Sequence, residues 1–310
     1  METRRLAVLL ELSRLGSMRE VAEEMGTTTS TVSQQIAALA REAGTPLVEP
    51  DGRRVRLTPA GRRLAEHAVT ILAAVEAARL DLDPHSEPAG TVRVAGFATA
   101  VRSSLVPVLH ETARAHPRVR LLIHEHEPAE AFALLRTDDV DLALTYDYDL
   151  APSDFDLTLE STPLWTTRWG LGVHADEVAV GGDAPRVFAH FADRDWIVNS
   201  RNTADADVVR TIASMAGFDP RVSHRVDSLE LVQELVAAGL GVGLLPADQP
   251  TRPDVALLPL TDPEVRLRAY AVVRRGRSAW PPLALVLARI QATLDGQAGP
   301  AADAAVPPSR

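Results

Sequence analysis

The chain has 310 residues, which at roughly 150 residues per domain suggests about two domains. It contains no cysteine and no lysine, which excludes disulfides, thiolate chemistry, Schiff-base lysines and the lysine of a phosphate-binding P-loop. No apolar run approaches the ~18 residues that a membrane-spanning helix needs, and the first residues lack the pattern of a secretory signal. We therefore expect a cytoplasmic protein with no membrane partner.

The net charge of −10 at pH 7 is unevenly distributed. Residues 1–66 have ten arginines against nine carboxylates, whereas the rest of the chain has 22 arginines against 33 carboxylates. Basic charge is concentrated in one short stretch, since Arg53, Arg54, Arg56, Arg62 and Arg63 lie close together. This distribution allows DNA binding by the N-terminal part despite the acidic total.

The N-terminal residues have the pattern of a helix-turn-helix. Apolar residues at helical spacing predict a first helix over residues 6–13. Ser17 and Glu20 form a capping box that opens a second helix, and Gly26 ends it. Thr28 can cap a third helix. The expected buried stripe of this third helix is Val32, Ile36 and Leu39.

A β-hairpin is predicted next, because Asp51-Gly52 is a dipeptide typical of tight hairpin turns. In the strand after the turn, apolar residues alternate with arginines, so one face is apolar and the other is basic. These residues are Arg54, Val55, Arg56 and Leu57. Together with the preceding helices, the hairpin predicts a winged helix-turn-helix.

A long helix is expected over residues 59–83, with Thr58 as N-cap and Pro59 at the first helical position. Six apolar residues along it are separated by steps of four and three, a heptad seam typical of a helix that pairs with its twin. These residues are Leu64, Ala68, Ile71, Val75, Ala78 and Leu82. We expect this helix to hold a homodimer together.

After a linker at residues 84–90, strands alternate with helices, which predicts a parallel, doubly wound α/β sheet. The expected strands are residues 91–96, 119–125, 141–146, 169–173, 195–199, 222–226, 242–245 and 265–273. The expected helices are residues 103–116, 128–136, 205–216, 229–238 and 283–294. The Ala- and Pro-rich residues 295–310 are expected to be a disordered tail.

Residues 17–61 resemble the DNA-binding signature of LysR-type transcriptional regulators. The matching residues are 21–25, Thr28, 32–36, Leu39, 44–47 and 52–61. The C-terminal half resembles the effector domain of this family at residues 90–95, 141–144, 216–218 and 237–246. At the start of the third helix, Thr29, Ser30 and Thr31 replace the Gln-Pro-Ala usual in the family. The base preference of relatives therefore does not transfer to this chain.

The resemblance implies a winged helix-turn-helix, a linker helix and a two-lobed effector domain similar to periplasmic binding proteins. The implied boundaries are residues 1–58 for the DNA-binding domain, 59–83 for the dimerisation helix, 84–90 for the linker and 91–294 for the effector domain. Within the effector domain, lobe I would comprise residues 91–162 and 267–294, and lobe II residues 163–266. The family further implies a tetramer formed through the effector domains.

The N-terminal residues of a recognition helix enter the major groove of double-stranded DNA. Hydroxyl groups and glutamine can bind base edges, and arginines of a wing suit phosphates or the minor groove. The residues expected to bind DNA are Thr28, Thr29, Ser30, Thr31, Ser33, Gln34, Arg53, Arg54 and Arg56. The alternative for these residues is an ordinary solvated helix face and a hairpin edge protected by charge.

A small-molecule effector is expected between the lobes, because ligands of α/β sheets bind at the carboxyl ends of strands. Thr99 and Ser103 lie where a helix begins and its free N–H groups attract anions, and Arg201 could bind a ligand carboxylate. The expected effector site comprises Thr99, Ala100, Ser103, His126, Tyr146, Asn199, Ser200, Arg201 and Asp227. These residues predict an anionic or polar ligand, and the alternative for each is a surface loop or a helix cap.

Two other patterns do not indicate a metal or a cofactor. His124 and His126 share one face of a strand, but no third metal ligand is visible near them. The glycines of residues 239–243 follow a helix and precede a strand, which is the reverse of the dinucleotide-binding order. No catalytic motif of the Gly-x-Ser-x-Gly or His-Glu-x-x-His type is present, so we expect no enzyme activity.

Two alternatives to an effector-responsive regulator remain. The first is a constitutive DNA-binding repressor whose C-terminal domain only oligomerises. The second is an enzyme or solute-binding module fused to a DNA-binding domain. The polar residues at strand ends favour a ligand site over a purely structural domain. The missing catalytic motifs argue against an enzyme, and the missing signal peptide argues against a periplasmic binding protein.

Overall fold

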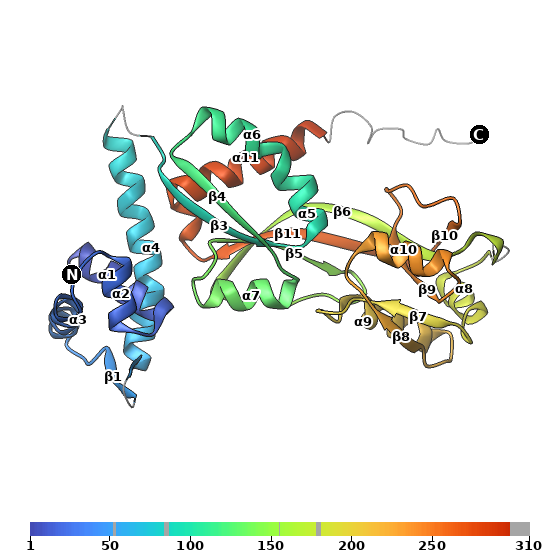
Figure 1. Cartoon of the computed structure of the whole chain (residues 1–310), viewed down its shortest axis with the longest axis horizontal. Helices are drawn as coiled ribbons and strands as arrows, with labels where there is room; N and C mark the ends of the chain where they lie inside the picture. Colours follow the sequence, from blue (N-terminus) through green and yellow to red (C-terminus); the bar gives the residue numbers. More distant parts are fainter. Residues whose placement is uncertain (52–53, 84–86, 155, 178–180, 298–310) are drawn as a thin grey trace, which may run out of the picture.

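The computed structural model describes residues 1–51, 54–83, 87–154, 156–177 and 181–297. A small helical unit and one long upright helix lie beside a larger, elongated α/β body (Figure 1). None of the helices in these residues has the length and apolar character to cross a membrane.

The helical unit contains α1 (Thr3–Leu15), α2 (Met18–Glu24) and α3 (Thr29–Ala43). The three helices share a hydrophobic core because each turns one apolar stripe inward. This core includes Leu6, Leu9, Leu12, Val21, Val32, Ile36 and Leu39. The stripe predicted for the third helix is confirmed, since its three residues are at most 2% exposed.

Side-chain caps fix the ends of these helices. The Ser17 hydroxyl accepts the Glu20 N–H of α2 at 3.4 Å, and Thr28 Oγ1 accepts the Thr31 N–H of α3 at 3.2 Å. Gly26 has a φ of +59°, a left-handed conformation that glycine adopts without strain. The predicted turn between α2 and α3 is therefore confirmed.

The wing consists of β1 (Val48–Asp51) and β2 (Arg54–Leu57), which pair antiparallel with Asp51 opposite Arg54. Gly52 and Arg53, for which a turn and a DNA contact are predicted, lie outside the described residues. Of Arg54 only the backbone is described.

The two faces of β2 differ as predicted. Val55 and Leu57 pack against the helical core, whereas Arg56 is exposed and forms an ion pair with Glu49 at 2.9 Å. Exposed ion pairs of this kind contribute only about 0–1 kcal/mol, so Arg56 can exchange Glu49 for another anion at little cost.

Helix α4 (Pro59–Leu82) begins as predicted, with Thr58 Oγ1 accepting the Gly61 N–H at 3.0 Å. Its heptad seam is divided between two environments. Leu64, Ala68 and Ile71 pack in the helix-turn-helix core, whereas Ala78 is exposed and Leu82 is 84% exposed. Only the C-terminal part of the seam is therefore free to meet another chain.

The middle of α4 also contacts the α/β body. Thr70 Oγ1 donates a hydrogen bond to the backbone oxygen of Arg275 at 3.3 Å, next to Gly276. A Cβ at Gly276 would lie 2.3 Å from Thr70 Oγ1, so the two segments touch without room for a side chain. A short 3₁₀ turn, η3 (Arg277–Ala279), follows this contact.

The α/β body has a nine-stranded mixed sheet. Its strands are β3 (Gly90–Gly96), β4 (Val119–Glu125), β5 (Leu142–Tyr148), β6 (Leu159–His174), β7 (Asp195–Val198), β8 (Arg221–Arg225), β9 (Val242–Pro246), β10 (Val255–Pro259) and β11 (Val265–Arg274). The strands β4, β3 and β5 are parallel, as are β8, β7 and β9. Between these groups, β11 and β6 pair antiparallel and run through both halves of the body (Figure 1).

Helices cover both halves of the sheet. Their bounds are α5 (Ala98–Ala100), α6 (Val106–Ala115), α7 (Pro128–Arg136), α8 (Ala184–His190), α9 (Ala204–Met215), α10 (Leu229–Ala237) and α11 (Pro281–Gln297). A 3₁₀ turn, η2 (Ala175–Glu177), follows β6. In Figure 1, α6 and α11 lie on one side of β3 and β4 and α7 on the other, while α8, α9 and α10 surround the second half. The predicted two-lobed architecture is confirmed.

The structure corrects two expectations about the sheet. The sheet is not parallel throughout, because β6 and β11 run against their neighbours. The strand predicted over residues 169–173 in fact begins at Leu159. A proline such as Pro163 cannot donate to a strand ladder, so a strand through it needs a local irregularity. The register of β6 against β11 shifts between Pro163 and Trp165, which leaves Leu164 as the extra residue of a β-bulge.

Three further elements differ from the prediction. The helix expected over residues 103–116 is preceded by a wider π-helical segment, η1 (Val101–Leu105). Pro107 lacks an N–H group and cannot bond to the preceding turn, which accounts for the altered pitch. Helix α8 and strand β10 were not predicted.

Candidate functional site

A cavity of about 490 Å³ lies between the two halves of the α/β body. It lies at the carboxyl ends of the parallel strands of both halves, where the loops that follow these strands begin. Its lining residues include Phe97, Thr99, Arg102, Ser103, Glu125, Glu127, Tyr146, Trp165, Trp169, Asn199, Asp205, Val226, Asp227, Glu230 and Asp248. Both lobes therefore contribute walls.

Five of the nine residues predicted for an effector line this cavity. They are Thr99, Ser103, Tyr146, Asn199 and Asp227. The other four do not appear among its lining residues. Ala100 is fully buried, and His126 lies beside Glu130 at 3.4 Å. Ser200 and Arg201 are engaged by protein groups, as described next.

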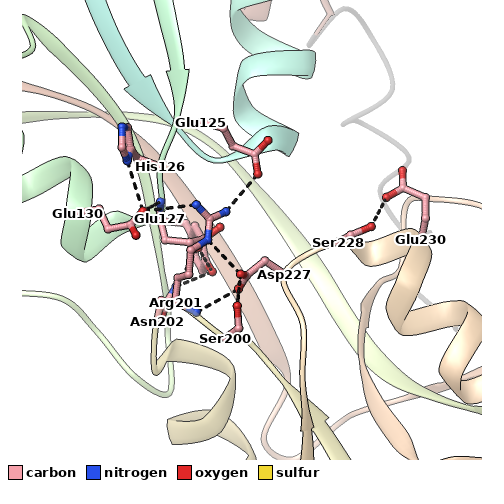
Figure 2. A network of polar contacts seen from close by, with 11 residues as sticks. Glu125, His126, Glu127, Glu130, Ser200, Arg201, Asn202, Asp227, Ser228 and Glu230 are labelled. Carbon is pink, nitrogen blue, oxygen red and sulfur yellow. Dashed lines mark hydrogen bonds and ion pairs between the residues drawn. The ribbon is translucent and has the colours of Figure 1, made fainter.

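Arg201 bonds to carboxylates from both lobes (Figure 2). Its Nε lies 3.1 Å from Asp227 Oδ2, its Nη2 lies 3.2 Å from Glu125 Oε1, and its Nη1 lies 3.5 Å from Glu130 Oε2. Glu125 ends β4 and Glu130 lies in α7, whereas Arg201 and Asp227 belong to the other lobe. The guanidinium predicted to bind a ligand carboxylate thus forms an ion-pair clasp across the cleft.

Asp227 anchors the lobe II side of this clasp. The Ser200 N–H donates to Asp227 Oδ1 at 2.8 Å, and the Ser200 hydroxyl bonds to Asp227 Oδ2. Burial tends to raise the pKa of Asp227, but the hydrogen bonds from Ser200 and Arg201 outweigh it and lower that pKa. Asp227 is therefore an ionised carboxylate with its own donors.

A second contact across the cleft joins Glu127 and Tyr146 to Asn202. Figure 2 shows Glu127 and Asn202. The Tyr146 hydroxyl donates to Glu127 Oε2 at 3.0 Å. Asn202 Nδ2 donates to the same oxygen at 3.1 Å and to the Tyr146 hydroxyl oxygen at 2.6 Å. Glu127 is 5% exposed, and burial raises its pKa although both hydrogen bonds oppose the shift.

Asp205 is a further carboxylate in the cavity wall. It lies in the first turn of α9 and accepts a hydrogen bond from the Tyr148 hydroxyl at 2.8 Å. Burial raises the pKa of Asp205 to about 7, and the negative charges of Glu127 and Asp227 add to the shift. This group titrates near neutral pH, which ordinary aspartates do not.

Aromatic rings form much of the remaining wall. The Phe97 ring centroid lies 4.6 Å from that of Tyr146 and 6.3 Å from that of Trp165. The Trp165 indole N–H donates to the buried Ser104 hydroxyl at 3.0 Å, which fixes this ring. Trp169 is 8% exposed, and its indole nitrogen has no partner among the described residues.

The sequence did not indicate Glu127, Asn202 or Asp205. Glu127 directly follows the paired histidines His124 and His126 in the sequence, and in the structure it caps α7. Its position directly after β4 was an available signal, because parallel strands end at one edge of the sheet. The pairing of Asn202 with Glu127 joins residues 75 positions apart, which no local pattern can reveal.

The residues predicted to bind DNA lie at the start of α3. Thr29, Ser33 and Gln34 are exposed. The Thr28 Oγ1 atom lies 2.9 Å from the Ser30 hydroxyl and 2.8 Å from the Thr31 hydroxyl, so these three hydroxyls form one cluster at the cap. The structure thus presents a polar surface at the N-terminal end of this helix.

The paired histidines show no metal-like cluster. The His124 and His126 ring centroids lie 6.3 Å apart. Within the described part of the chain, no group of three or more His, Asp or Glu side chains has the geometry to hold a metal ion.

The raised pKa of Asp205 generates a prediction about pH. Because folding favours the protonated acid, the charged form destabilises the native state as pH rises from the unfolded pKa near 4 to the folded value near 7. The Asp205→Asn variant lacks this penalty and can still accept the Tyr148 hydrogen bond. Its gain in stability should grow between pH 5 and pH 7 by on the order of 1.4 kcal/mol per pH unit, then stay constant.

Thermal unfolding at pH 5, 6, 7 and 8 measures this effect. The Asp207→Asn variant is the matched control, because Asp207 lies on the same helix, is partly exposed and pairs with Arg210. It should show no such growth. A stability difference for Asp205→Asn that is independent of pH would contradict the raised pKa.

Two family models match consecutive parts of the chain. The model described as "Bacterial regulatory helix-turn-helix protein, lysR family" matches residues 3–62. The model described as "LysR substrate binding domain" matches residues 85–295, which is more than half of the chain.

Curated relatives and solved structures extend over nearly the whole chain. The transcriptional dual regulator GltC of Bacillus subtilis is 27% identical over 290 residues, covering 91% of this chain and 93% of the relative. The DNA-binding transcriptional dual regulator OxyR of Escherichia coli is 27% identical over 307 residues, covering 96% of this chain and 97% of the relative.

Among solved structures, a full-length OxyR variant from Pseudomonas aeruginosa has a TM-score of 0.68 at 18% identity, covering 95% of this chain and 94% of that one. ArgP from Mycobacterium tuberculosis has a TM-score of 0.67 at 20% identity, covering 96% of this chain and 98% of that one. At these identities the two structures show the fold alone. The match of both family models shows that the chain belongs to the LysR family of transcriptional regulators, with a helix-turn-helix DNA-binding domain followed by an effector-binding domain.

Proposed function

We propose that a small molecule bound in the cavity between the lobes alters how this regulator holds DNA. The observation that supports this most directly is the cavity itself, because its volume of about 490 Å³ falls in the range of small-molecule sites and its walls come from both lobes. We also propose that the chain has no enzymatic activity and acts in the cytoplasm.

A ligand in this cavity can act on the relative orientation of the lobes. The lobes are held together across the cleft by the Arg201 clasp and by the bonds of Asn202 to Glu127 and Tyr146. A ligand that replaces some of these bonds favours one orientation over another. It shifts the equilibrium only by as much as its affinities for the two orientations differ.

The contact between α4 and the end of β11 offers a route from the cleft to the DNA-binding domain. The strand β11 runs from one lobe to the other and ends at Arg274. The next residues, Arg275 and Gly276, touch Thr70 in the middle of α4. A change in lobe orientation can therefore reach α4 through this short segment.

For DNA recognition, we propose that the start of α3 lies in the major groove and that the wing contacts the backbone or minor groove. The proposed contact residues are Thr28, Thr29, Ser30, Thr31, Ser33, Gln34, Arg53, Arg54 and Arg56. The exposure of Ser33 and Gln34 on the face opposite the buried stripe supports this assignment.

We propose that the chain forms a homodimer through the C-terminal part of α4, and a tetramer through the effector domains. The support is the exposure of Ala78 and Leu82 on one apolar seam. We also propose the division into residues 1–58, 59–83, 84–90, 91–294 and 295–310, with lobe I comprising residues 91–162 and 267–294 and lobe II residues 163–266.

Several relatives are described as hydrogen peroxide-inducible genes activators. A response to peroxide through a cysteine thiol is excluded for this chain, because it contains no cysteine. The alternative of a constitutive repressor would leave the polar cavity without a role. A DNA affinity that no small molecule changes would favour this alternative.

The Gln34→Ala variant tests the recognition helix. A bidentate contact to a base contributes about 1–3 kcal/mol of discrimination, so affinity for a DNA site selected from random sequences should fall roughly 5- to 150-fold. Affinity for unrelated DNA should stay the same, because phosphate contacts supply it. Titrations with labelled duplexes measure both quantities.

The control is Gln291→Ala, which removes an exposed glutamine from α11, far from α3 in the fold. It should bind both duplexes as the unmodified protein does. Equal binding of Gln34→Ala and Gln291→Ala to the selected site would refute the placement of Gln34 at a base.

The Ala78→Glu variant tests the dimer seam. Ala78 is exposed in one chain, so the fold should survive, but a glutamate from each of two paired helices would bring unpaired negative charges into an apolar contact. Sedimentation velocity should show loss of the dimer formed through α4, and DNA affinity should fall with it. Ala189→Glu, at an exposed position of α8, is the control and should change neither. Unaltered assembly of Ala78→Glu would exclude this seam.

The regulatory proposal is tested by linkage. A thermal-shift screen of small metabolites on the full-length protein supplies a bound compound, and calorimetry then measures its affinity with and without the selected DNA site. We expect the two affinities to differ about 5- to 150-fold, and DNA affinity to change by the same factor on adding the compound. Equal affinities for every bound compound would show that the C-terminal domain does not regulate DNA binding.

A further inference from the structure

The cavity between the lobes is strongly acidic. Its lining carboxylates are Glu125, Glu127, Asp205, Asp227, Glu230 and Asp248. Among the described residues that line it, Arg102 is the only arginine. The sequence predicts an anionic or polar ligand, and most of this wall would repel an anionic one.

Some of these carboxylates already have a cation from the protein. Glu125 and Asp227 share Arg201, and Glu230 lies 3.6 Å from Arg102. These pairs neutralise part of the charge at the rim of the cavity, because Arg201 is shared by several carboxylates. The case for a charged ligand is stronger at the carboxylates that form no ion pair.

Glu127 and Asp205 differ from the rim. Their hydrogen bonds come from neutral side chains and the backbone, with Tyr146 and Asn202 donating to Glu127 and Tyr148 donating to Asp205. Within the described residues, neither forms an ion pair. The charge of Arg201 acts on Glu127 without an ion pair between them and is the smallest of the named influences on its pKa. A cation in direct contact would therefore lower the cost of keeping these carboxylates charged.

The two carboxylates are neighbours because their tyrosine donors are neighbours. Tyr146 and Tyr148 are two positions apart in β5, so both side chains lie on the same face of the sheet. Their ring centroids are 6.1 Å apart. The negative charge of Glu127 in turn helps to raise the pKa of Asp205. One positive group placed between them would favour the ionised form of both.

Aromatic rings lie next to this acidic pair. Phe97, Trp165 and Trp169 line the same cavity. Aromatic faces attract organic cations, and they also bury the apolar part of a ligand. Trp169 is buried beside the cavity, and its indole N–H is without a partner among the described residues.

We propose that the ligand of this cavity is a small organic cation, with an ammonium, amidinium or guanidinium head between Glu127 and Asp205 and an apolar body against Phe97 and Trp165. The inference rests on the proposed function, because it concerns the same cavity. The Arg201 clasp shows that a planar cation fits among carboxylates of both lobes, since its guanidinium already bonds to three of them.

Two probes of equal shape and opposite charge test the ligand class. Benzamidinium and benzoate are titrated into the full-length protein without DNA, and calorimetry measures their dissociation constants at pH 7.5. We expect benzamidinium to bind at least tenfold more tightly than benzoate. Equal affinities, tighter binding of benzoate, or no binding of either probe would overturn the proposal.

Variants locate the charged head. Glu127→Gln and Asp205→Asn keep shape and hydrogen-bond acceptors but remove the charge, so each should weaken benzamidinium binding at least fivefold and leave benzoate no weaker. Asp219→Asn, at an exposed position outside the cavity lining, is the matched control and should bind both probes as the unmodified protein does. Circular dichroism verifies that each variant is folded. Retention of the full benzamidinium preference in both Glu127→Gln and Asp205→Asn would overturn the assignment of the site.

The test of the ligand class and the test of the proposed regulatory function can give different answers. If benzamidinium binds as expected but does not alter the affinity for the selected DNA site, the ligand class stands and the regulatory coupling is contradicted for this compound. If instead an anionic compound from the screen binds in the cavity and changes DNA affinity, regulation stands and the cation proposal is overturned.

Discussion

The antiparallel pairing of β6 with β11 is the constraint on which the rest of the molecule depends. These two strands pair from Val265 opposite Trp169 to Arg274 opposite Leu159, and each passes from one lobe to the other. They form the middle of the nine-stranded sheet and connect its two parallel groups of strands. The bulge at Leu164 interrupts the ladder within this pair, and a bulge locally bends and twists a strand. Any change in lobe orientation must therefore be absorbed in this pair or in the polar contacts that bridge the cleft.

Those bridging contacts set how easily the lobes move. The Arg201 clasp is partly exposed, and its ion pairs exchange with water at modest cost. The bonds of Asn202 to Glu127 and Tyr146 are more deeply buried, and breaking them without replacement leaves unsatisfied polar groups. A ligand that supplies new partners for Glu127 and Tyr146 removes that penalty. The chemistry of the cavity wall thus decides which molecules can change the equilibrium between lobe orientations. A molecule that offers no hydrogen-bond partner to Glu127 and Tyr146 does not replace the bonds that are lost when the lobes move.

Local signals in the sequence predicted most of the helices and strands. Contacts between segments far apart in the chain could not be predicted from it. Thr28 and Thr58 were predicted as caps because a cap depends only on the next three residues, and both are confirmed. The early part of β6 was missed because Pro163 argues against a strand, and only the bulge opposite β11 makes it compatible with one. Arg201 was predicted to bind a ligand because its position at a strand end was visible from the sequence. Its carboxylate partners in lobe I lie more than 70 residues away, so the sequence could not show that this arginine is already occupied.

The heptad seam of α4 shows how one sequence pattern can serve several contacts. A step of four and three residues places side chains on one stripe, but it does not determine what covers that stripe. Ala68 is covered by the helix-turn-helix of the same chain, whereas Leu82 is left exposed. The middle of the same helix touches Arg275 and Gly276 at the end of β11 through Thr70. Because α4 is one continuous helix, a displacement at Thr70 moves the attached recognition helix together with the exposed seam. The spacing between two recognition helices in a dimer would then follow the orientation of the lobes, and the DNA geometry that the dimer prefers would change with it.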